Sequence, residues 1–357
     1  MADLFNINPD IKKSPTLPSE FYREEKYFEQ SKEKIFSKTW QFIGDTDLVK
    51  VPGQVHPFTL LDGFMNEPLL LTRDFNDNIN CLSNICTHRA NVICEGSENV
   101  KALRCRYHGR QFELTGKFKF MPEFETCENF PTEKDNLPKV DFEVFNNLIF
   151  ASLNPASPFS DFFKEIKERL HWFPFDKLVL DVNRSKDYLV KAHWALYCEN
   201  YLEGFHIPYI HKGLNDVLDY TNYTQEIYRY TNLQVGRAKS GEVTFDNSPE
   251  NDIAAYYYWV FPNMMFNFYP WGLSINVVRP IEKDLTKVSF ITYIADESKY
   301  NMGAGSSLDR VEREDEAIVE NVQKGVNSQL YKSGRFSPKR EEGVHHFHML
   351  INEFMSK

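Results

Sequence analysis

The stretches CTHRAN, residues 86–91, and CRYHGRQFELTG, residues 105–116, decide how this chain is organised. Each stretch brings one cysteine and one histidine onto a single short turn. Together the two turns offer two thiolates and two imidazoles, a set that can hold a metal centre. Gly109 suits a tight ligand loop, because glycine adopts backbone conformations that other residues avoid. The four candidate ligands are Cys86, His88, Cys105 and His108.

Two kinds of metal centre use two cysteines and two histidines. In a Rieske [2Fe–2S] cluster the thiolates hold one iron and the imidazoles hold the other. A zinc finger usually places both cysteines in one pair and both histidines in the other pair. Here both pairs are mixed. The order of the ligands therefore predicts a Rieske cluster, with a tetrahedral zinc site as the alternative.

A second set of candidate ligands lies in the segment NYLEGFHIPYIH, residues 200–211. A regular helix would turn the rings of His206 and His211 to different sides, because they are five residues apart. Pro208 bends or breaks this segment, so an irregular turn could bring both rings to one point. Taken alone, the spacing is also compatible with two ordinary histidines. An electron-transfer cluster in a longer chain implies an electron acceptor, and two histidines with one carboxylate form the facial triad of non-haem Fe(II) oxygenases.

The carboxylate must come from another part of the chain, and the helical pattern over residues 308–332 offers several acids. Asp315 is expected to point inward, where a carboxylate must be paired or bind a metal. An acid that favours the N-terminal dipole of the helix is the alternative. The expectation rests on one helical stripe that Asp315 shares with Val311, Ile318, Val319, Val322 and Val326.

The composition is that of a globular chain of 357 residues, 42% of them hydrophobic and 26% charged. This length suggests about two domains. A net charge of -10 argues against nucleic acid or an anionic membrane as the main partner. No apolar run approaches the roughly 18 residues of a membrane span, and the first residues lack the apolar core of a signal peptide. We therefore expect a cytoplasmic protein whose cysteines are reduced or metal-bound.

The sequence changes in character along the chain. Residues 19–40 predict one helix with an apolar stripe. Short β-type runs broken by Asp-Gly and Asn-Asp follow to about residue 155, and a Pro/Ser-rich stretch at 154–160 marks a boundary. Helix and strand patterns mix beyond it. We predict an α+β chain with an N-terminal helical segment, 1–40, an antiparallel β domain that carries the cluster, 41–155, and a catalytic domain, 156–357.

These segments resemble the α subunits of the Rieske non-haem iron oxygenases over nearly the whole chain. The resemblance is strongest to the choline monooxygenase-like oxygenases of quaternary ammonium compounds. Besides the cysteine and histidine stretches, it is carried by NYLEGFHIPYIHKGL at 200–214, FPNMMFNFYPWGLSINVVRP at 261–280, EDEAIVENVQKGVNSQLY at 314–331 and HHFHML at 345–350.

The resemblance implies a Rieske β domain followed by a helix-grip domain, in which helices cover an antiparallel sheet. It also implies a mononuclear Fe(II) on His206, His211 and Asp315, with Asn200 near the iron. Glu203 occupies the place of an acidic residue that, in many members, bridges this iron to the cluster of a neighbouring subunit. A glutamate is longer than the usual aspartate, and one glycine follows it here, which puts the bridging role in doubt. Members are commonly homotrimers.

The implied function is that of an oxygenase component that hydroxylates a small molecule. It would use O₂ and electrons from an NAD(P)H-dependent flavin or iron–sulfur reductase, directly or through a ferredoxin. A quaternary ammonium substrate such as choline, betaine or carnitine is favoured, because aromatic rings can cage its cationic head. Aromatic ring hydroxylation is the alternative, since the same rings can bind a planar substrate. A non-catalytic Rieske electron carrier would leave about 200 residues unexplained.

Overall fold

The computed structural model describes residues 4–211, 213, 222–245, 252–306 and 308–357. The chain divides into two compact units, which are described separately. One unit is Trp40–Pro155, and the other combines Met1–Thr39 with Ala156–Lys357. Within the described ranges, no helix is long and apolar enough to cross a membrane.

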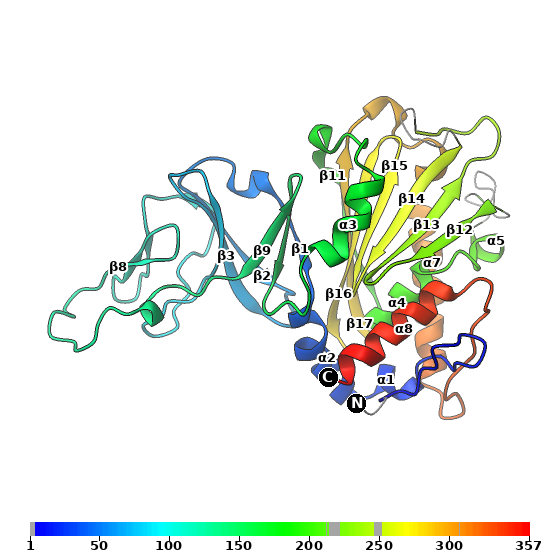
Figure 1. Ribbon diagram of the computed structural model, residues 1–357, viewed down its shortest axis with the longest axis horizontal. Helices are drawn as coiled ribbons and strands as arrows, with labels where there is room; N and C mark the ends of the chain where they lie inside the picture. The colour runs from blue at the N-terminus through cyan, green and yellow to red at the C-terminus, as the bar shows by residue number, and fades with distance from the viewer. Residues whose placement is uncertain (1–3, 212, 214–221, 246–251, 307) are drawn as a thin grey trace. The chain divides into compact units, whose positions relative to one another are not determined.

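The unit Trp40–Pro155 is built from short antiparallel strands (Figure 1). Its sheets surround a core that includes Leu70, Leu82 and Phe112, together with the side chains of Cys86 and Cys105. The loops that carry the candidate cluster ligands are thus anchored in the core. Three sheets have the orders β1 (Gln41–Asp45)–β10 (Leu148–Ser152)–β9 (Asp141–Phe145), β4 (Ile79–Ser83)–β3 (Glu67–Arg73)–β2 (Gln54–Leu60)–β5 (Glu98–Asn99), and β6 (Leu103–Arg104)–β7 (Gln111–Phe112)–β8 (Phe118–Phe120).

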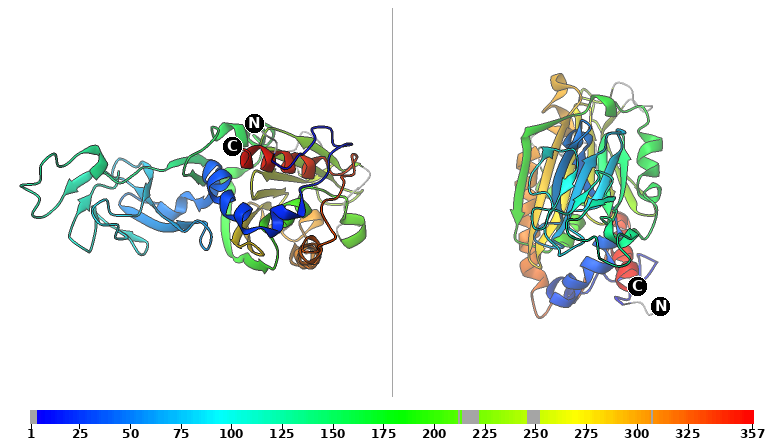
Figure 2. Two further views of the ribbon diagram at one scale, coloured as in Figure 1. Left: turned by 90° about the horizontal axis from the view of Figure 1, so that it is seen from below. Right: turned by 90° about the vertical axis from the view of Figure 1, so that its left-hand side faces the viewer.

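The described part of the second unit contains a seven-stranded antiparallel sheet with helices on both sides (Figures 1 and 2). The predicted α+β class, a β domain followed by a sheet-and-helix domain, is confirmed. The strand order is β11 (Val179–Val190), β17 (Leu285–Ile294), β16 (Gly272–Glu282), β15 (Met264–Tyr269), β14 (Ile253–Val260), β13 (Thr231–Arg237) and β12 (Thr224–Ile227). The α-helices in the described part of this unit are α1 (Ser19–Arg23), α2 (Glu25–Lys34), α3 (Ser160–Arg169), α4 (Trp194–Tyr201), α5 (Ile207–Ile210), α7 (Leu308–Val326) and α8 (Glu342–Met355).

The register of this sheet puts polar side chains in one cross-strand row. Tyr257 on β14 pairs with Asn267 on β15, and Asn267 pairs with Ser274 on β16. Successive residues of a strand face opposite sides, so Phe266 points the other way, where its ring lies 5.5 Å from that of Phe163 on α3. Helices α3 and α7 lie on opposite sides of the sheet (Figure 2). The polar row therefore faces the side of α7.

The single helix predicted over residues 19–40 is wrong, because the chain breaks it at Glu24. Glu24 has the extended conformation φ -90°, ψ 122°, which ends α1 and starts α2. The rings of Phe21, Tyr22 and Phe28 all lie within 6.1 Å of the buried ring of His193. Residues from both short helices thus pack against His193.

Candidate metal centres

The two cluster loops of the first unit share one backbone pattern. The Cys86 N–H donates to the Asn91 carbonyl at 2.9 Å, and the Cys105 N–H donates to the Arg110 carbonyl at 2.8 Å. In each loop the fourth residue after the cysteine donates back to the cysteine carbonyl at 3.0 Å and has a left-handed φ, +52° at Ala90 and +78° at Gly109. The loops are equivalent, although the histidine stands second after Cys86 and third after Cys105.

The four side chains fit a cluster that binds through two thiolates and two imidazoles. The rings of His88 and His108 have centroids 4.8 Å apart. Burial raises the pKa of the Cys86 thiol, and a hydrogen bond with Cys105 raises it further. A buried thiol ionises more readily beside a cation, and an iron centre would supply that positive charge at Cys86.

A buried arginine follows the second loop. Arg110 is only 2% exposed, and its Nη2 donates to Oδ1 of Asp135 at 2.7 Å. Its guanidinium also lies 5.0 Å from the ring centroid of Phe118 and 5.5 Å from that of Phe130. The loop of Cys105 is thus fixed by an ion pair inside an aromatic cage.

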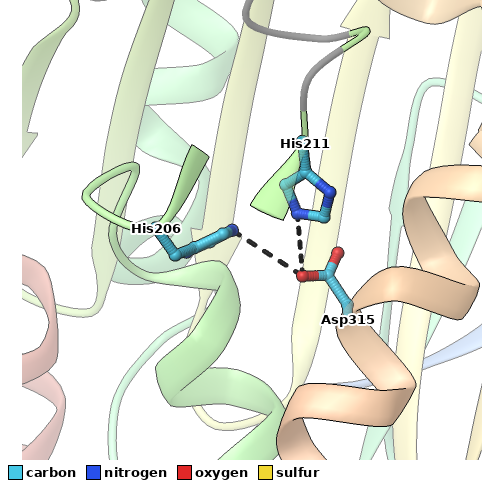
Figure 3. Close-up of side chains that lie close together, drawn as sticks. All are labelled: His206, His211 and Asp315. Atoms are coloured by element: carbon cyan, nitrogen blue, oxygen red, sulfur yellow. Dashed lines mark hydrogen bonds and ion pairs between the residues drawn. The ribbon is translucent and has the colours of Figure 1, made fainter. Parts of the chain in front are cut away.

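In the second unit, His206, His211 and Asp315 converge on one point (Figure 3). Their candidate ligand atoms all lie within 4.8 Å of one another. Oδ1 of Asp315 lies 3.0 Å from Nε2 of His211 and 3.7 Å from Nε2 of His206. Two imidazoles and one carboxylate on one side of a point leave the opposite side open, as in the facial triad of non-haem iron.

A carboxylate holds the far nitrogen of each histidine. Nδ1 of His206 lies 2.7 Å from Oε1 of Glu203, and Nδ1 of His211 lies 2.9 Å from Oε2 of Glu314. A neutral imidazole that donates its Nδ1 proton keeps the lone pair of Nε2 for a metal. Both Nε2 atoms face Asp315, so a metal ion could bind to the two Nε2 atoms and the Asp315 carboxylate.

The convergence of the histidines depends on a very short helix. His206 precedes the first residue of α5, His211 follows the last, and Pro208 lies in the first turn. Proline is tolerated there because the first N–H groups of a helix lack partners inside it. The two rings end with centroids 5.1 Å apart. The predicted break at Pro208 is instead a single helical turn.

The helix stripe used to place Asp315 is partly wrong. Ile318 is 36% exposed and Val322 is 43% exposed, so they do not share a buried face with Asp315. The buried positions of α7 are instead Glu312, Val319, Gln323 and Val326. Asp315 stands at the edge of this face. The Nδ2 group of Asn200 donates to its Oδ1 at 2.6 Å and fixes it there.

Comparison with known proteins agrees with both constellations. Residues 39–131 match the Rieske [2Fe-2S] domain, and residues 175–357 match the ring hydroxylating alpha subunit (catalytic domain).

The chain belongs to the Rieske ring-hydroxylating oxygenases.

Membership implies a Rieske [2Fe–2S] cluster and a mononuclear iron, so the zinc and electron-carrier alternatives are wrong. Choline monooxygenase (chloroplastic) of Arabidopsis thaliana is 27% identical over 98% of this chain and 85% of its own length. The carnitine monooxygenase oxygenase subunit of Escherichia coli (strain K12) is 26% identical over 98% of this chain and 96% of its own length. A crystal structure of the quaternary ammonium Rieske monooxygenase CntA with an inhibitor has the same fold, with a TM-score of 0.80, 22% identity and 99% of both chains covered.

A cavity of about 120 Å³ adjoins the triad of this Rieske oxygenase. The described part of its wall includes the acids Glu203, Glu312 and Asp315 and the polar row of the sheet. Burial raises the pKa of Glu312 well above its usual range, and the hydrogen bond from Tyr197 only partly opposes this. The tyrosines among the described wall residues are Tyr197, Tyr201, Tyr223, Tyr257 and Tyr269.

Sequence reasoning missed two acids of this site. Glu314 forms a hydrogen bond with Nδ1 of His211. Glu312 is 3% exposed and lies in the wall of the cavity. The Glu-Asp pair at 314–315 was a signal for Glu314, because two adjacent acids can contact the two ring nitrogens of one histidine, here His211. No sequence signal singled out Glu312. Glu203, expected to bridge to another subunit, accepts hydrogen bonds within this chain from the backbone N–H groups of Phe205 and His206.

Proposed function

We propose that this Rieske oxygenase hydroxylates a small quaternary ammonium compound such as choline, betaine or carnitine, at an N-alkyl carbon or at an alcohol carbon. The observation that carries the proposal is the cavity beside the triad, which joins tyrosine rings to acidic side chains. Tyrosine faces and carboxylates both attract an organic cation. The names of the choline and carnitine monooxygenases point to the same class of substrate.

The residues that would hold the metals are those of the two constellations. Cys86, His88, Cys105 and His108 would hold the cluster, and His206, His211 and Asp315 would hold the iron. When bound, the iron would supply open coordination positions for O₂ beside the substrate. One oxygen atom enters the C–H bond and the other leaves as water, with two electrons from NAD(P)H through a reductase and two protons.

The surrounding residues position this site. Glu203 and Glu314 keep the Nδ1 protons of the two histidines on the outer side, and Asn200 orients Asp315. Carboxylates in this position orient ligands and raise their basicity. We further propose a homotrimer in which Glu203 connects His206 to His108 of the partner subunit.

The test is NAD(P)H-coupled oxygen uptake with a Rieske reductase and a panel of quaternary ammonium compounds and aromatic acids. We expect uptake with a quaternary ammonium compound, and one ¹⁸O atom from ¹⁸O₂ in its hydroxylated product. Coupled uptake with an aromatic acid alone would replace this proposal by the aromatic alternative. Metal analysis of the same preparation should give about three irons and two acid-labile sulfides per chain.

A further inference from the structure

Glu312 is a buried acid that the positioning of the iron ligands does not use. Its side chain comes from α7, one turn before Asp315, and is 3% exposed. Oε2 accepts a hydrogen bond from the Tyr197 hydroxyl at 2.5 Å. Among the described residues, Oε1 has no hydrogen-bond partner, although it is inaccessible to solvent. A buried carboxyl oxygen without a partner is costly, so its place in the wall of the substrate cavity calls for a ligand.

The charges around this oxygen are unevenly distributed. The described residues that line the cavity include three carboxyl side chains and neither lysine nor arginine. The remaining polar groups of the sheet wall, on Gln234, Asn267, Ser274 and Asn276, are neutral. Amides and hydroxyls can hydrogen-bond a substrate hydroxyl, but they cannot neutralise a carboxylate that has lost its water.

The described cations of a neighbouring cavity are already paired. A second cavity, of about 340 Å³, shares Glu312 with the first and has Arg184 and Lys186 in its wall. Arg184 contacts Glu297 at 2.5 Å, and Lys186 contacts Asp309 at 2.7 Å. A substrate carboxylate that reached them would have to displace these acids. The second cavity therefore offers no unpaired described cation that could bind a substrate carboxylate.

We propose that Glu312 is a specificity-determining residue that selects an organic cation with an uncharged tail, of the choline type, over zwitterions such as carnitine or glycine betaine. The inference rests on the proposed function and narrows it. The cationic head favours the ionised form of Glu312, which burial alone disfavours, and the tyrosine rings attract the same head. The neutral amide wall receives a hydroxyl. A zwitterion would bring a carboxylate for which the described lining of the cavity offers neither lysine nor arginine.

The test measures binding to the oxygenase with both metal centres loaded, without reductase and under anaerobic conditions. Isothermal titration compares choline with L-carnitine, glycine betaine and 3,3-dimethyl-1-butanol, the neutral isostere of choline. We expect choline to bind at least about tenfold more tightly than each of the other three, since a cation–π cage and one charge-assisted contact together provide at least that factor.

Two variants assign the effect to Glu312. Glu312→Gln keeps the shape but cannot ionise beside a bound cation, and it should weaken choline binding by about tenfold while leaving the binding of 3,3-dimethyl-1-butanol unchanged. Glu320→Gln is the matched control, because Glu320 lies two turns further along α7, accepts from the Lys191 N–H at 3.0 Å and lies outside the described lining of the cavity. It should bind choline like the parent protein.

The outcomes separate this inference from the proposed function. Equal or tighter binding of carnitine or glycine betaine by the parent protein overturns the inference and leaves quaternary ammonium hydroxylation standing. This comparison needs no variant, so poor folding of Glu312→Gln would not protect the idea. Unchanged choline binding in a folded Glu312→Gln protein removes Glu312 from recognition. Failure of every quaternary ammonium compound to bind overturns both the inference and the proposed function.

Discussion

Replacing Glu314 should weaken the mononuclear iron site without touching the three candidate ligands. Oε2 of Glu314 lies 2.9 Å from Nδ1 of His211, and this hydrogen bond is the main cause that lowers the pKa of the Glu314 carboxyl. Loss of a carboxylate that orients a metal-binding histidine typically costs 10- to 100-fold in affinity, or about 1.4–2.8 kcal/mol. The Glu314 side chain is 26% exposed, which favours the lower part of this range.

The isosteric Glu314→Gln variant keeps an acceptor for the Nδ1 proton and loses the charge, so we expect about a tenfold loss of iron affinity. Glu314→Ala loses both and should approach a hundredfold loss. Competition with a ferrous chelator measures the affinity, and the visible spectrum of the Rieske cluster serves as an internal control. Arg310→Ala removes an exposed partner of Glu314 at 3.1 Å and should change little. Unchanged iron affinity in Glu314→Ala would refute the role given to this carboxylate.

Glu203→Gln should keep both metal centres and lose turnover, as measured by iron content and coupled oxygen uptake; full activity would remove Glu203 from the electron path. Although burial lowers it, hydrogen bonds with Asp315 and Glu314 raise the pKa of His211 in the metal-free site. Its proton must leave before iron binds, so ferrous affinity should rise as pH increases through this raised pKa and fall at lower pH, in titrations between about pH 6 and 8. An affinity independent of pH would contradict this assignment. Arg110→Leu leaves Asp135 without its buried partner and should destabilise the cluster unit by about 2–3 kcal/mol. This is less than the full cost of breaking a buried ion pair, because the Asp135 side chain is 19% exposed and partly solvated. Denaturant unfolding followed by the cluster absorbance checks this value, and a change below about 0.5 kcal/mol would show that the pair contributes little.

The cluster motif was the part of the molecule most accessible from sequence. Its ligands lie on two local turns, and a local turn depends on a few neighbouring residues. Gly109, expected in a tight loop, does adopt a left-handed φ of +78°. The equivalent position in the other loop is Ala90, which has a φ of +52° although it is not a glycine, so the sequence did not indicate this turn. The equivalence of the two loops therefore appeared only in the structure.

The sequence named His206, His211 and Asp315 as candidate iron ligands, but it did not reveal the geometry that brings them together. Whether His206 and His211 meet depends on one helical turn between them, and a histidine spacing alone does not reveal that turn. Asp315 was found on a hydrophobic stripe whose phase was wrong. At this site the buried face of α7 carries Glu312 and Gln323, while Ile318 and Val322 are exposed. Functional positions break the usual apolar pattern, so the pattern misplaces the face where function lies.

The most direct test of the two-centre account is an iron anomalous difference map from crystals of the purified oxygenase. We predict one peak within ligand distance of Nε2 of His206, Nε2 of His211 and a carboxylate oxygen of Asp315. A separate pair of iron peaks should lie between the sulfur atoms of Cys86 and Cys105 and the rings of His88 and His108. A map with the cluster peaks but no iron among His206, His211 and Asp315, in protein that is active, would contradict the account.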